Sequence, residues 1–328
     1  MTIVKTCGKL YWAGEYAILE PGQLALIKAI PIYMTAEIES SEVYRLYSDM
    51  FTYSVDMRPD SSYALIQETV ALVEYYLTAQ GVDLQPFFLD IRGKMERQGK
   101  KFGLGSSGSV VVLVIKAMLA FYDRPAERDL LFKLASAVLL KRGDNGSMGD
   151  IACIVSEDLV LYQSFDREKV AQWLEKEDLP TVLARDWGFS IRSVEPALDF
   201  DFLVGWTKEV AVSSQMVKQI KDNMNASFLQ SSEETVANLV KALQMGQEET
   251  VIDMLEQASQ LLEGLSSDIY TPSLRQLKNA IHDLKAVAKS SGAGGGDCGI
   301  ALSFDQDSTT LLKKRWADLG IELLYQER

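Results

Sequence analysis

The most constraining feature of this sequence is a glycine- and serine-rich loop followed directly by an apolar segment, in the stretch FGLGSSGSVVVLVIKAMLAF that begins at Phe102. The periodicity of the second half predicts a buried helix over Ser107–Phe121. The first backbone N–H groups of a helix have no partner inside it, and they favour an anion placed off the helix start. The stretch therefore predicts a phosphate-binding loop that a buried helix holds in place.

The residue types of the loop fit a phosphate. Its glycines let the backbone approach a ligand without a Cβ in the way, and the hydroxyls of Ser106, Ser107 and Ser109 can cap the helix, donate to phosphate or bind Mg²⁺. The loop lacks the GK[ST] ending of a Walker A motif, and it is not a GxGxxG pattern followed by a ribose-binding acid. These absences exclude the two commonest nucleotide folds. A glycine-rich turn with a serine cap and no ligand stays open as an alternative.

The length and charge of the chain limit its class. Its 328 residues, 47% of them hydrophobic, are enough for two domains, and we expect these over 1–195 and 196–328. The formal net charge of -13 opposes general affinity for nucleic acid or an anionic membrane. The most apolar run, Val110–Phe121, is shorter than the ~18 to 20 residues that cross a bilayer, and the amino terminus does not resemble a signal peptide. We expect a cytoplasmic protein.

Three cysteines at positions 7, 153 and 298 form no CxxC pair, so neither a disulfide framework nor a structural zinc site is indicated. All three lie within or beside motif stretches, which suggests that they gather near one cleft, although packing alone explains them. The single histidine, His282, lies in the helical pattern NAIHDLKAVA and is expected at the surface. A His-based zinc site or a Ser-His-Asp triad is therefore not indicated.

Both halves of the chain have an α+β pattern. β-Rich runs predict strands over Thr2–Thr6, Ile30–Glu39, Val43–Ser48, Phe87–Ile91 and Leu159–Gln163. Helical periodicity predicts helices over Tyr63–Ala79, Ser107–Phe121 and Glu127–Lys141, and helical segments from Ser213 to Ala288 with breaks at Asn225, Gly246 and Pro272. The stretch DWGFSIRSVEPALDFDFLVGW predicts strands around a proline, and the end of the chain predicts strand, helix and strand.

Two more stretches indicate a ligand site. KLYWAGEYAIL, from Lys9 to Leu19, follows the first strand, and KSSGAGGGDCGIAL, from Lys289 to Leu302, precedes a late strand. A run such as GAGGG is costly in conformational entropy and usually lies where backbone packs against backbone or ligand. A hinge or surface loop is the alternative.

In this order, GKLxxxGEY, GLGSSGS and SSGAGGGDCG resemble the three signature motifs of the GHMP kinases, and the resemblance spans nearly the whole chain. It implies ATP-dependent phosphoryl transfer and a two-domain α+β fold. The N-terminal mixed α/β domain would carry a left-handed βαβ-type nucleotide site, and the C-terminal α+β domain would be ferredoxin-like. KRGDNGSMGDIACI and GWTKEVAVSSQMV look most like family members whose acceptor carries both a phosphate and a carboxylate.

The resemblance also implies roles for residues. Asp150 matches the catalytic base, Lys9 matches its partner lysine, and Ser107 matches the Mg²⁺ ligand. Other members have a second Mg²⁺ ligand, a glutamate, where this chain has leucines in VLLKRGDN, so Asp144 is the candidate there; the familiar GEH of the first motif is GEY, with Tyr16. The implied ATP-binding residues are Lys101, Gly103, Leu104, Gly105, Ser106, Ser107, Gly108 and Ser109.

An anionic acceptor requires local cations on an acidic protein. We favour Lys101, although surface solvation explains any one of the cations near the motifs, which are Lys100, Lys101, Lys141, Arg142, Lys208 and Lys289. The implied acceptor-binding residues are Lys9, Lys101, Ser147, Ser213, Ser291, Gly292 and Ala293. A phosphate nucleophile is already ionised near neutral pH and needs no strong base, so Lys9 would matter more than Asp150 for catalysis. Asp150 would either remove a proton or orient Lys9.

Three alternatives stay open at this point. The chain resembles family members that phosphorylate an alcohol and a sibling that decarboxylates its substrate, and it could be a nucleotide-binding regulator without catalysis. Retention of Lys9, Asp150 and Ser107 together argues against the regulator. We expect a monomer or a weak homodimer.

Overall fold

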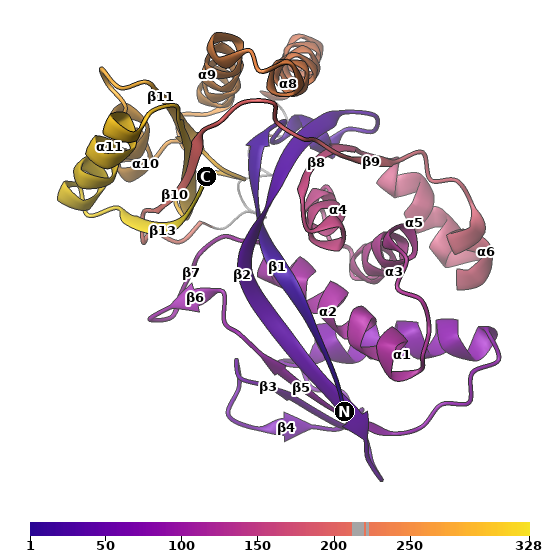
Figure 1. Ribbon diagram of the computed structural model, residues 1–328. Coiled ribbons are helices and arrows are strands. Elements are labelled where there is room, and N and C mark those ends of the chain that lie inside the picture. The colour runs from indigo at the N-terminus through magenta and orange to yellow at the C-terminus, as the bar shows by residue number, and fades with distance from the viewer. Residues whose placement is uncertain (212–219, 221–222) are drawn as a thin grey trace.

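The computed structural model describes residues 1–211, 220 and 223–328 (Figure 1). Within these residues, the N-terminal part is built on a seven-stranded sheet with the order β4-β3-β5-β2-β8-β9, in which β1 pairs with β2. Its strands are β1 (Thr2–Ala13), β2 (Leu24–Ser40), β3 (Arg45–Ser48), β4 (Ser54–Val55), β5 (Phe87–Arg92), β8 (Leu159–Gln163) and β9 (Ser190–Ser193). The long β2 is the organising strand, because it pairs with β1, with β5 near its end and with β8 near its start.

Helices α1 to α6 gather on one side of the β1–β2 ribbon (Figure 1). They are α1 (Ala64–Ala79), α2 (Ser106–Phe121), α3 (Arg128–Lys141), α4 (Gly149–Ser156), α5 (Arg167–Lys176) and α6 (Leu179–Ala184), with a short 3-10 turn η1 (Ala17–Leu19) and a hairpin of β6 (Glu96–Arg97) and β7 (Lys100–Lys101). Helix α2 packs on β1 and β2 and is flanked by α1, α3 and α4. Every side chain from Val111 to Ile115 is fully buried, as expected for a helix that is apolar on all faces.

The C-terminal part contains a four-stranded antiparallel sheet of the order β11-β12-β10-β13. Its described elements are β10 (Asp201–Trp206), α8 (Ala226–Met245), α9 (Glu248–Leu265), α10 (Pro272–Asn279), β11 (Ala286–Ser290), β12 (Cys298–Ser303), α11 (Gln306–Asp318) and β13 (Glu322–Glu327). With the helices between β10 and β11 taken as one layer, this is the β-α-β-β-α-β order of a ferredoxin-like sheet, as the resemblance implies.

The two sheets share one hydrophobic core. Along β10, Phe202 and Val204 belong to the same buried cluster as β1 and β2, whereas Leu203 points to the opposite face and joins Trp316 of α11. This alternation follows from the period of two along a strand, and both faces of β10 are buried. The chain leaves the first sheet after Ser193 and enters the second at Asp201; the division at residue 195 stays a prediction.

Some predicted elements are wrong or too short. The helical prediction up to Ala288 is wrong, because α10 ends at Asn279 and β11 is a fully buried strand. His282 therefore lies in a turn, and its side chain is 90% exposed. Strand β1 extends beyond Thr6 to Ala13 because its second half is buried on both faces, which removes the alternation that sequence reasoning needs.

The short helices α4, α5 and α6 were not predicted from the sequence. Two of them begin at an aspartate whose side chain accepts a hydrogen bond from the first turn, Asp166 for α5 and Asp178 for α6. Over the described residues, no helix has the length and apolar character needed to cross a membrane.

Candidate active site

The three glycine-bearing motifs meet around a cavity of about 480 Å³. The first motif contributes β1 and the turn after it, the second contributes the start of α2, and the third contributes the loop after β11. The predicted site residues that line the cavity are Lys9, Lys101, Gly103, Leu104, Gly105, Ser106, Ser107, Ser147, Asp150, Gly292 and Ala293. The fold therefore brings together predicted site residues that lie far apart in the sequence, such as Lys9 and Ala293, which are separated by 284 positions.

The loop before α2 has the geometry of an anion site. Gly103 and Gly105 have φ values of 78° and 80°, which L side chains rarely adopt, so glycine is required at both positions. The first backbone hydrogen bond of α2 is donated by the N–H of Ser109 to the carbonyl of Gly105, at 3.0 Å. The N–H groups of the residues before Ser109 are thus the unpaired donors of a helix start, and Ser106 and Ser107 line the cavity.

Lys9 reaches the loop from β1. Its backbone N–H donates to the carbonyl of Leu104 at 3.0 Å, and its Nζ donates to the carbonyl of Gly103 at 3.4 Å. The side chain is largely buried, with 8% of the residue exposed. This places the ammonium group at the rim of the phosphate loop.

Asp150 lies on the other side of the same loop, in the first turn of α4. Burial raises the pKa of its carboxyl group, and the nearby positive charge of Lys9 opposes that rise. The side chains of Lys9 and Asp150 are close enough to interact electrostatically, but no salt bridge joins them in the described structure. Because the ammonium group of Lys9 is not neutralised by a salt bridge to Asp150, it can interact with an anionic ligand in the cavity.

Gly108 is not among the residues that line the cavity, and its role in ATP binding stays a prediction. A Cβ at this position would lie 2.7 Å from Oδ2 of Asp150 and 3.1 Å from Cδ1 of Ile151. Gly108 therefore gives Asp150 the room to reach the cavity from α4. At Gly149 a Cβ would lie 2.4 Å from the hydroxyl oxygen of Tyr11, which in turn shares a 2.9 Å hydrogen bond with Ser147.

Ser109 and Ser291 are two of the predicted serine ligands, and their hydroxyl groups are buried and already bonded within the chain, so their roles in ligand binding stay predictions. Ser109 is fully buried and donates to the carbonyl of Cys7 at 2.9 Å. Ser291 is 6% exposed and donates to the carbonyl of Tyr11 at 2.9 Å. Neither residue lines the cavity. The third predicted serine, Ser213, lies outside the described residues.

Asp144, the candidate for a second metal ligand, lies outside the cavity lining. Its carboxylate accepts a 2.6 Å hydrogen bond from the N–H of Gly146 and so stabilises a turn. Across the part of the chain that the structure describes, no three His, Cys, Asp or Glu side chains form a metal cluster.

Among the predicted cations, only Lys9 and Lys101 line the cavity in the described structure. Lys208 pairs with Glu322 at 3.5 Å, and Lys289 is buried against Glu15 at 2.5 Å. Lys100 is exposed in β7 and does not line the cavity. These positions support the preference for Lys101.

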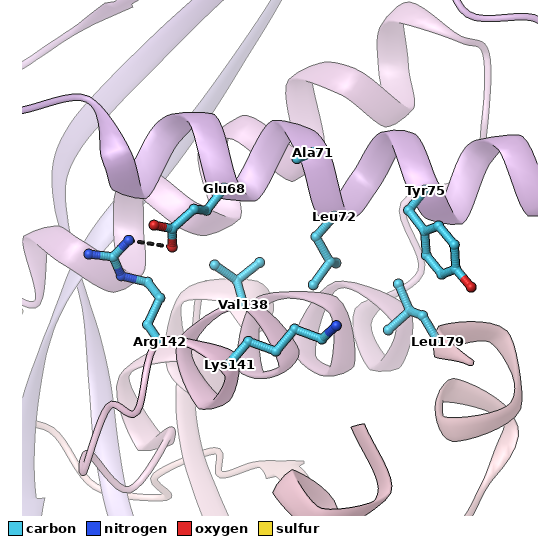
Figure 2. Close-up of a pocket in the computed structure, with 8 residues that line it drawn as sticks. All are labelled: Glu68, Ala71, Leu72, Tyr75, Val138, Lys141, Arg142 and Leu179. Carbon is cyan, nitrogen blue, oxygen red and sulfur yellow. Dashed lines mark hydrogen bonds and ion pairs between the residues drawn. The ribbon is translucent and has the colours of Figure 1, made fainter. Parts of the chain in front are cut away.

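Lys141 and Arg142 line a different hollow of about 580 Å³ between α1, α3 and α6 (Figure 2). Arg142 donates to Glu68 of α1 across the hollow, and the other lining residues include Leu72 and Tyr75. None of the three motifs contributes to this hollow. Its charged groups partly neutralise one another, so we do not assign it to the chemistry.

Asp297 also lines the cavity, although no role was predicted for it from the sequence. Its Oδ1 accepts a 3.3 Å hydrogen bond from the N–H of Ala211, and a Cβ on Gly103 would lie 2.6 Å from its Oδ2. Burial raises the pKa of this carboxyl group to about 6, opposed by the positive charges of Lys9 and Lys101. The sequence feature that could have identified Asp297 is its position as the only acidic residue within the third motif, GAGGGDCG.

The cysteines lie behind the phosphate loop, where all three are buried. Cys298 donates to the carbonyl of Phe102 at 3.1 Å, and Cys7 accepts through its carbonyl from Ser109. Burial raises the pKa of all three thiols, that of Cys7 to about 12. They pack the back of the site and do not line the cavity.

A helix-start phosphate loop, a lysine and a buried acid beside it, and a ferredoxin-like second sheet together define a small-molecule kinase of the GHMP type. The family description "GHMP kinases N terminal domain" matches residues 64–157, and "GHMP kinases C terminal" matches residues 239–322. The chain belongs to the GHMP kinase family. Its fold is the two-domain α+β fold of that family.

Particular relatives are more specific. The chain is 72% identical to Streptococcus pneumoniae phosphomevalonate kinase in complex with phosphomevalonate and AMPPNP, with a TM-score of 0.99 over 100% of both chains. It is 29% identical to a phosphomevalonate kinase from Streptomyces sp. (strain CL190), over 98% of this chain and 95% of the relative. A Methanococcus jannaschii mevalonate kinase shares the fold at 19% identity and a TM-score of 0.74, over 99% of this chain and 97% of the other.

Proposed function

We propose that the protein transfers the γ-phosphoryl group of ATP to (R)-5-phosphomevalonate, giving 5-diphosphomevalonate and ADP, a step in the mevalonate route to isopentenyl diphosphate and isoprenoids. The observation that carries this proposal is the cavity shared by the three motifs, in a chain 72% identical to an enzyme crystallised with phosphomevalonate and AMPPNP. This agrees with the acceptor class expected from the stretches over 141–154 and 205–217.

The ATP phosphates would bind at the start of α2. Residues 103–107 line the cavity, and the unpaired N–H groups of the helix start and the hydroxyls of Ser106 and Ser107 are the donors that they offer there. These donors favour negative charge, and the buried body of α2 keeps them in position. Lys101 lies at the same wall and supplies positive charge for the phosphates of the nucleotide or the acceptor.

The acceptor would bind between Lys9, Lys101, Ser147 and the backbone of Gly292 and Ala293, all of which line the cavity. Phosphomevalonate carries a phosphate and a carboxylate, and two lysines suit these anions on a protein whose net charge is -13. Ser147 donates to or accepts from Tyr11, so it is held at a defined position on the wall.

The transfer itself requires positioning and charge compensation. The attacking group is a phosphate oxygen that is already ionised near neutral pH, so no strong base is needed. We assign to Lys9 the positive charge beside the attacking oxygen, and to Asp150 the orientation of Lys9. Lys9 is largely buried, with 8% of the residue exposed, which strengthens its electrostatic interactions.

The family implies Mg²⁺ with ATP, and the donors present fit that role. Mg²⁺ usually takes one or two protein ligands and several oxygens from phosphates and water, so a protein-only metal cluster is not required. The hydroxyl of Ser107 lines the cavity at the helix start and is the residue that would hold the ion. When bound, the ion would neutralise charge on the phosphate oxygens.

A coupled assay of ADP release tests the proposal. Mevalonate, phosphomevalonate and diphosphomevalonate are offered separately with Mg²⁺ and ATP, and rapid release is expected with phosphomevalonate alone. Release with mevalonate would identify a mevalonate kinase, and carbon dioxide from diphosphomevalonate would identify a decarboxylase. Binding of ATP with no turnover on any acceptor would identify a regulator.

We also propose that the protein acts in the cytoplasm, on ATP and phosphomevalonate, without nucleic acid or membrane partners. The net charge of -13 supports the last part, because it repels polyanions. We propose a monomer or weak homodimer in solution. Sedimentation velocity over a hundredfold range of protein concentration tests the oligomeric state.

A further inference from the structure

Tyr16 lies at the centre of a strained turn in the wall of the cavity. Its φ is 64° and its ψ is -53°, and the N–H of Ala17 donates to the carbonyl of Glu15 at 2.8 Å. These values describe a three-residue γ-turn of the positive-φ form, which is rare and strained. A bulky side chain persists in such a conformation only where its surroundings enforce it.

The side chains of Tyr16 and Glu15 each contact the third motif, and these two contacts hold the turn in its strained conformation. The hydroxyl of Tyr16 donates to the carbonyl of Ala293 at 2.5 Å. The carboxylate of Glu15 pairs with Lys289 at 2.5 Å, where both side chains are at most 3% exposed. Lys289 also donates to the carbonyl of Ser290 at 2.7 Å. Neighbouring residues of the first motif are thus tied to the third motif, more than 270 positions along the chain.

The contact at Ala293 lies in a segment with little stiffness of its own. Gly292, Gly294, Gly295 and Gly296 all have positive φ values, and glycine imposes few limits on a backbone. Gly292 and Ala293 line the cavity together with Tyr16. Tyr16 is only 4% exposed, and its hydroxyl is already used by Ala293. The tyrosine therefore acts on the loop and not directly on a ligand.

We propose that Tyr16 is a positioning residue for the acceptor end of the cavity. Its strained turn aims the hydroxyl at Ala293, and this hydrogen bond holds the Gly292–Ala293 backbone where the acceptor binds. The inference rests on the proposed function, because that function places phosphomevalonate against these two residues.

The test is Tyr16→Phe in the full chain, assayed for ADP release with phosphomevalonate. The ring is kept and only the hydroxyl is lost. The expected result is a KM for phosphomevalonate raised about tenfold, the scale of one lost buried hydrogen bond, with kcat within about threefold and the KM for ATP unchanged. A smaller fraction of folded protein would lower the apparent kcat and would not raise the KM for phosphomevalonate alone.

Tyr63→Phe is the matched control. The hydroxyl of Tyr63 also donates to a backbone carbonyl, that of Tyr53, at 2.5 Å, and Tyr63 is fully buried away from the cavity. It should lower the melting temperature and leave both KM values unchanged. An unchanged KM for phosphomevalonate in Tyr16→Phe, or an equal rise in Tyr63→Phe, overturns the role of Tyr16. Failure of the wild-type protein to phosphorylate phosphomevalonate overturns the proposed function itself.

Discussion

The side chain of Lys9 packs directly on Gly105 of the phosphate loop: a Cβ on Gly105 would lie 2.9 Å from Cε of Lys9. The same Cβ would lie 3.5 Å from Cβ of Asp150. The loop thus passes between the proposed catalytic lysine and acid, and any side chain at position 105 displaces one of them.

Gly105→Ala should lower kcat by at least ~10²-fold, the scale expected when a positioned catalytic group moves. Part of the effect comes from backbone strain at φ 80°. Gly81→Ala controls for that strain, because Gly81 has a φ of 74° and a Cβ there would meet nothing within 4 Å. Steady-state kinetics of the two variants separates the causes, and equal activity in both would contradict the packing argument.

Lys9→Met and Asp150→Asn should each lower turnover by at least ~10²-fold, with ATP affinity little changed. The lysine variant should be the more severe, because the acceptor oxygen is already ionised and needs charge compensation more than a base. Turnover is measured by ADP release and ATP affinity by calorimetry. Wild-type turnover in both variants would mean that the catalytic centre lies elsewhere.

Ser107→Ala should raise the KM for Mg·ATP about tenfold, because it removes a hydroxyl that lines the cavity at the helix start. Ser109→Ala is its control, since that hydroxyl is buried against the carbonyl of Cys7. The control should lower the melting temperature and leave the KM for Mg·ATP within about twofold. A larger KM effect from Ser109 than from Ser107 would reverse the assignment.

Asp297→Asn should stabilise the protein, increasingly so as the pH rises. Burial raises the pKa of the Asp297 carboxyl group from 3.8 to about 6, so the folded state holds this proton more tightly than the unfolded state. The ionised carboxylate therefore costs stability progressively from about pH 4 to pH 6, and the full cost, about 3 kcal/mol, is present above pH 6.

Urea unfolding of Asp297→Asn and the wild-type protein between pH 4.5 and 8 measures this cost. Asparagine keeps an oxygen that can accept from the N–H of Ala211, so the hydrogen bond does not confound the comparison. The difference in unfolding free energy should grow toward neutral pH and then level off. A constant difference, or one that grows toward acid pH, would show that the carboxyl group is not destabilised by burial.

Most of the fold was predictable wherever a segment has a single buried face or a strong period. Strand β8 and helix α3 agree with their predictions to within one residue. The second half of β1 and all of β11 were not predictable, because strands buried on both faces lose the alternation of polar and apolar residues. Short helices such as α4 depend on their neighbours more than on their own periodicity.

The motif residues of the site were predictable, but the state of each side chain was not. Ser291 lies in the expected motif, yet its hydroxyl bonds to Tyr11 from a strand 280 positions away, which no local pattern contains. The same holds for Asp297, whose contact with Gly103 and raised pKa depend on how the two parts of the chain pack. Sequence locates the loops, and long-range packing decides which atoms face the cavity.

In the proposed mechanism, the loop over residues 103–107 holds the ATP phosphates and presents them to an acceptor beside Lys9 and Lys101. A crystal structure of this protein with AMPPNP and phosphomevalonate tests it most directly. We expect the triphosphate at the start of α2, with its terminal phosphate facing the acceptor phosphate. A nucleotide bound elsewhere, for example in the hollow between α1 and α3, with the loop empty, would contradict it.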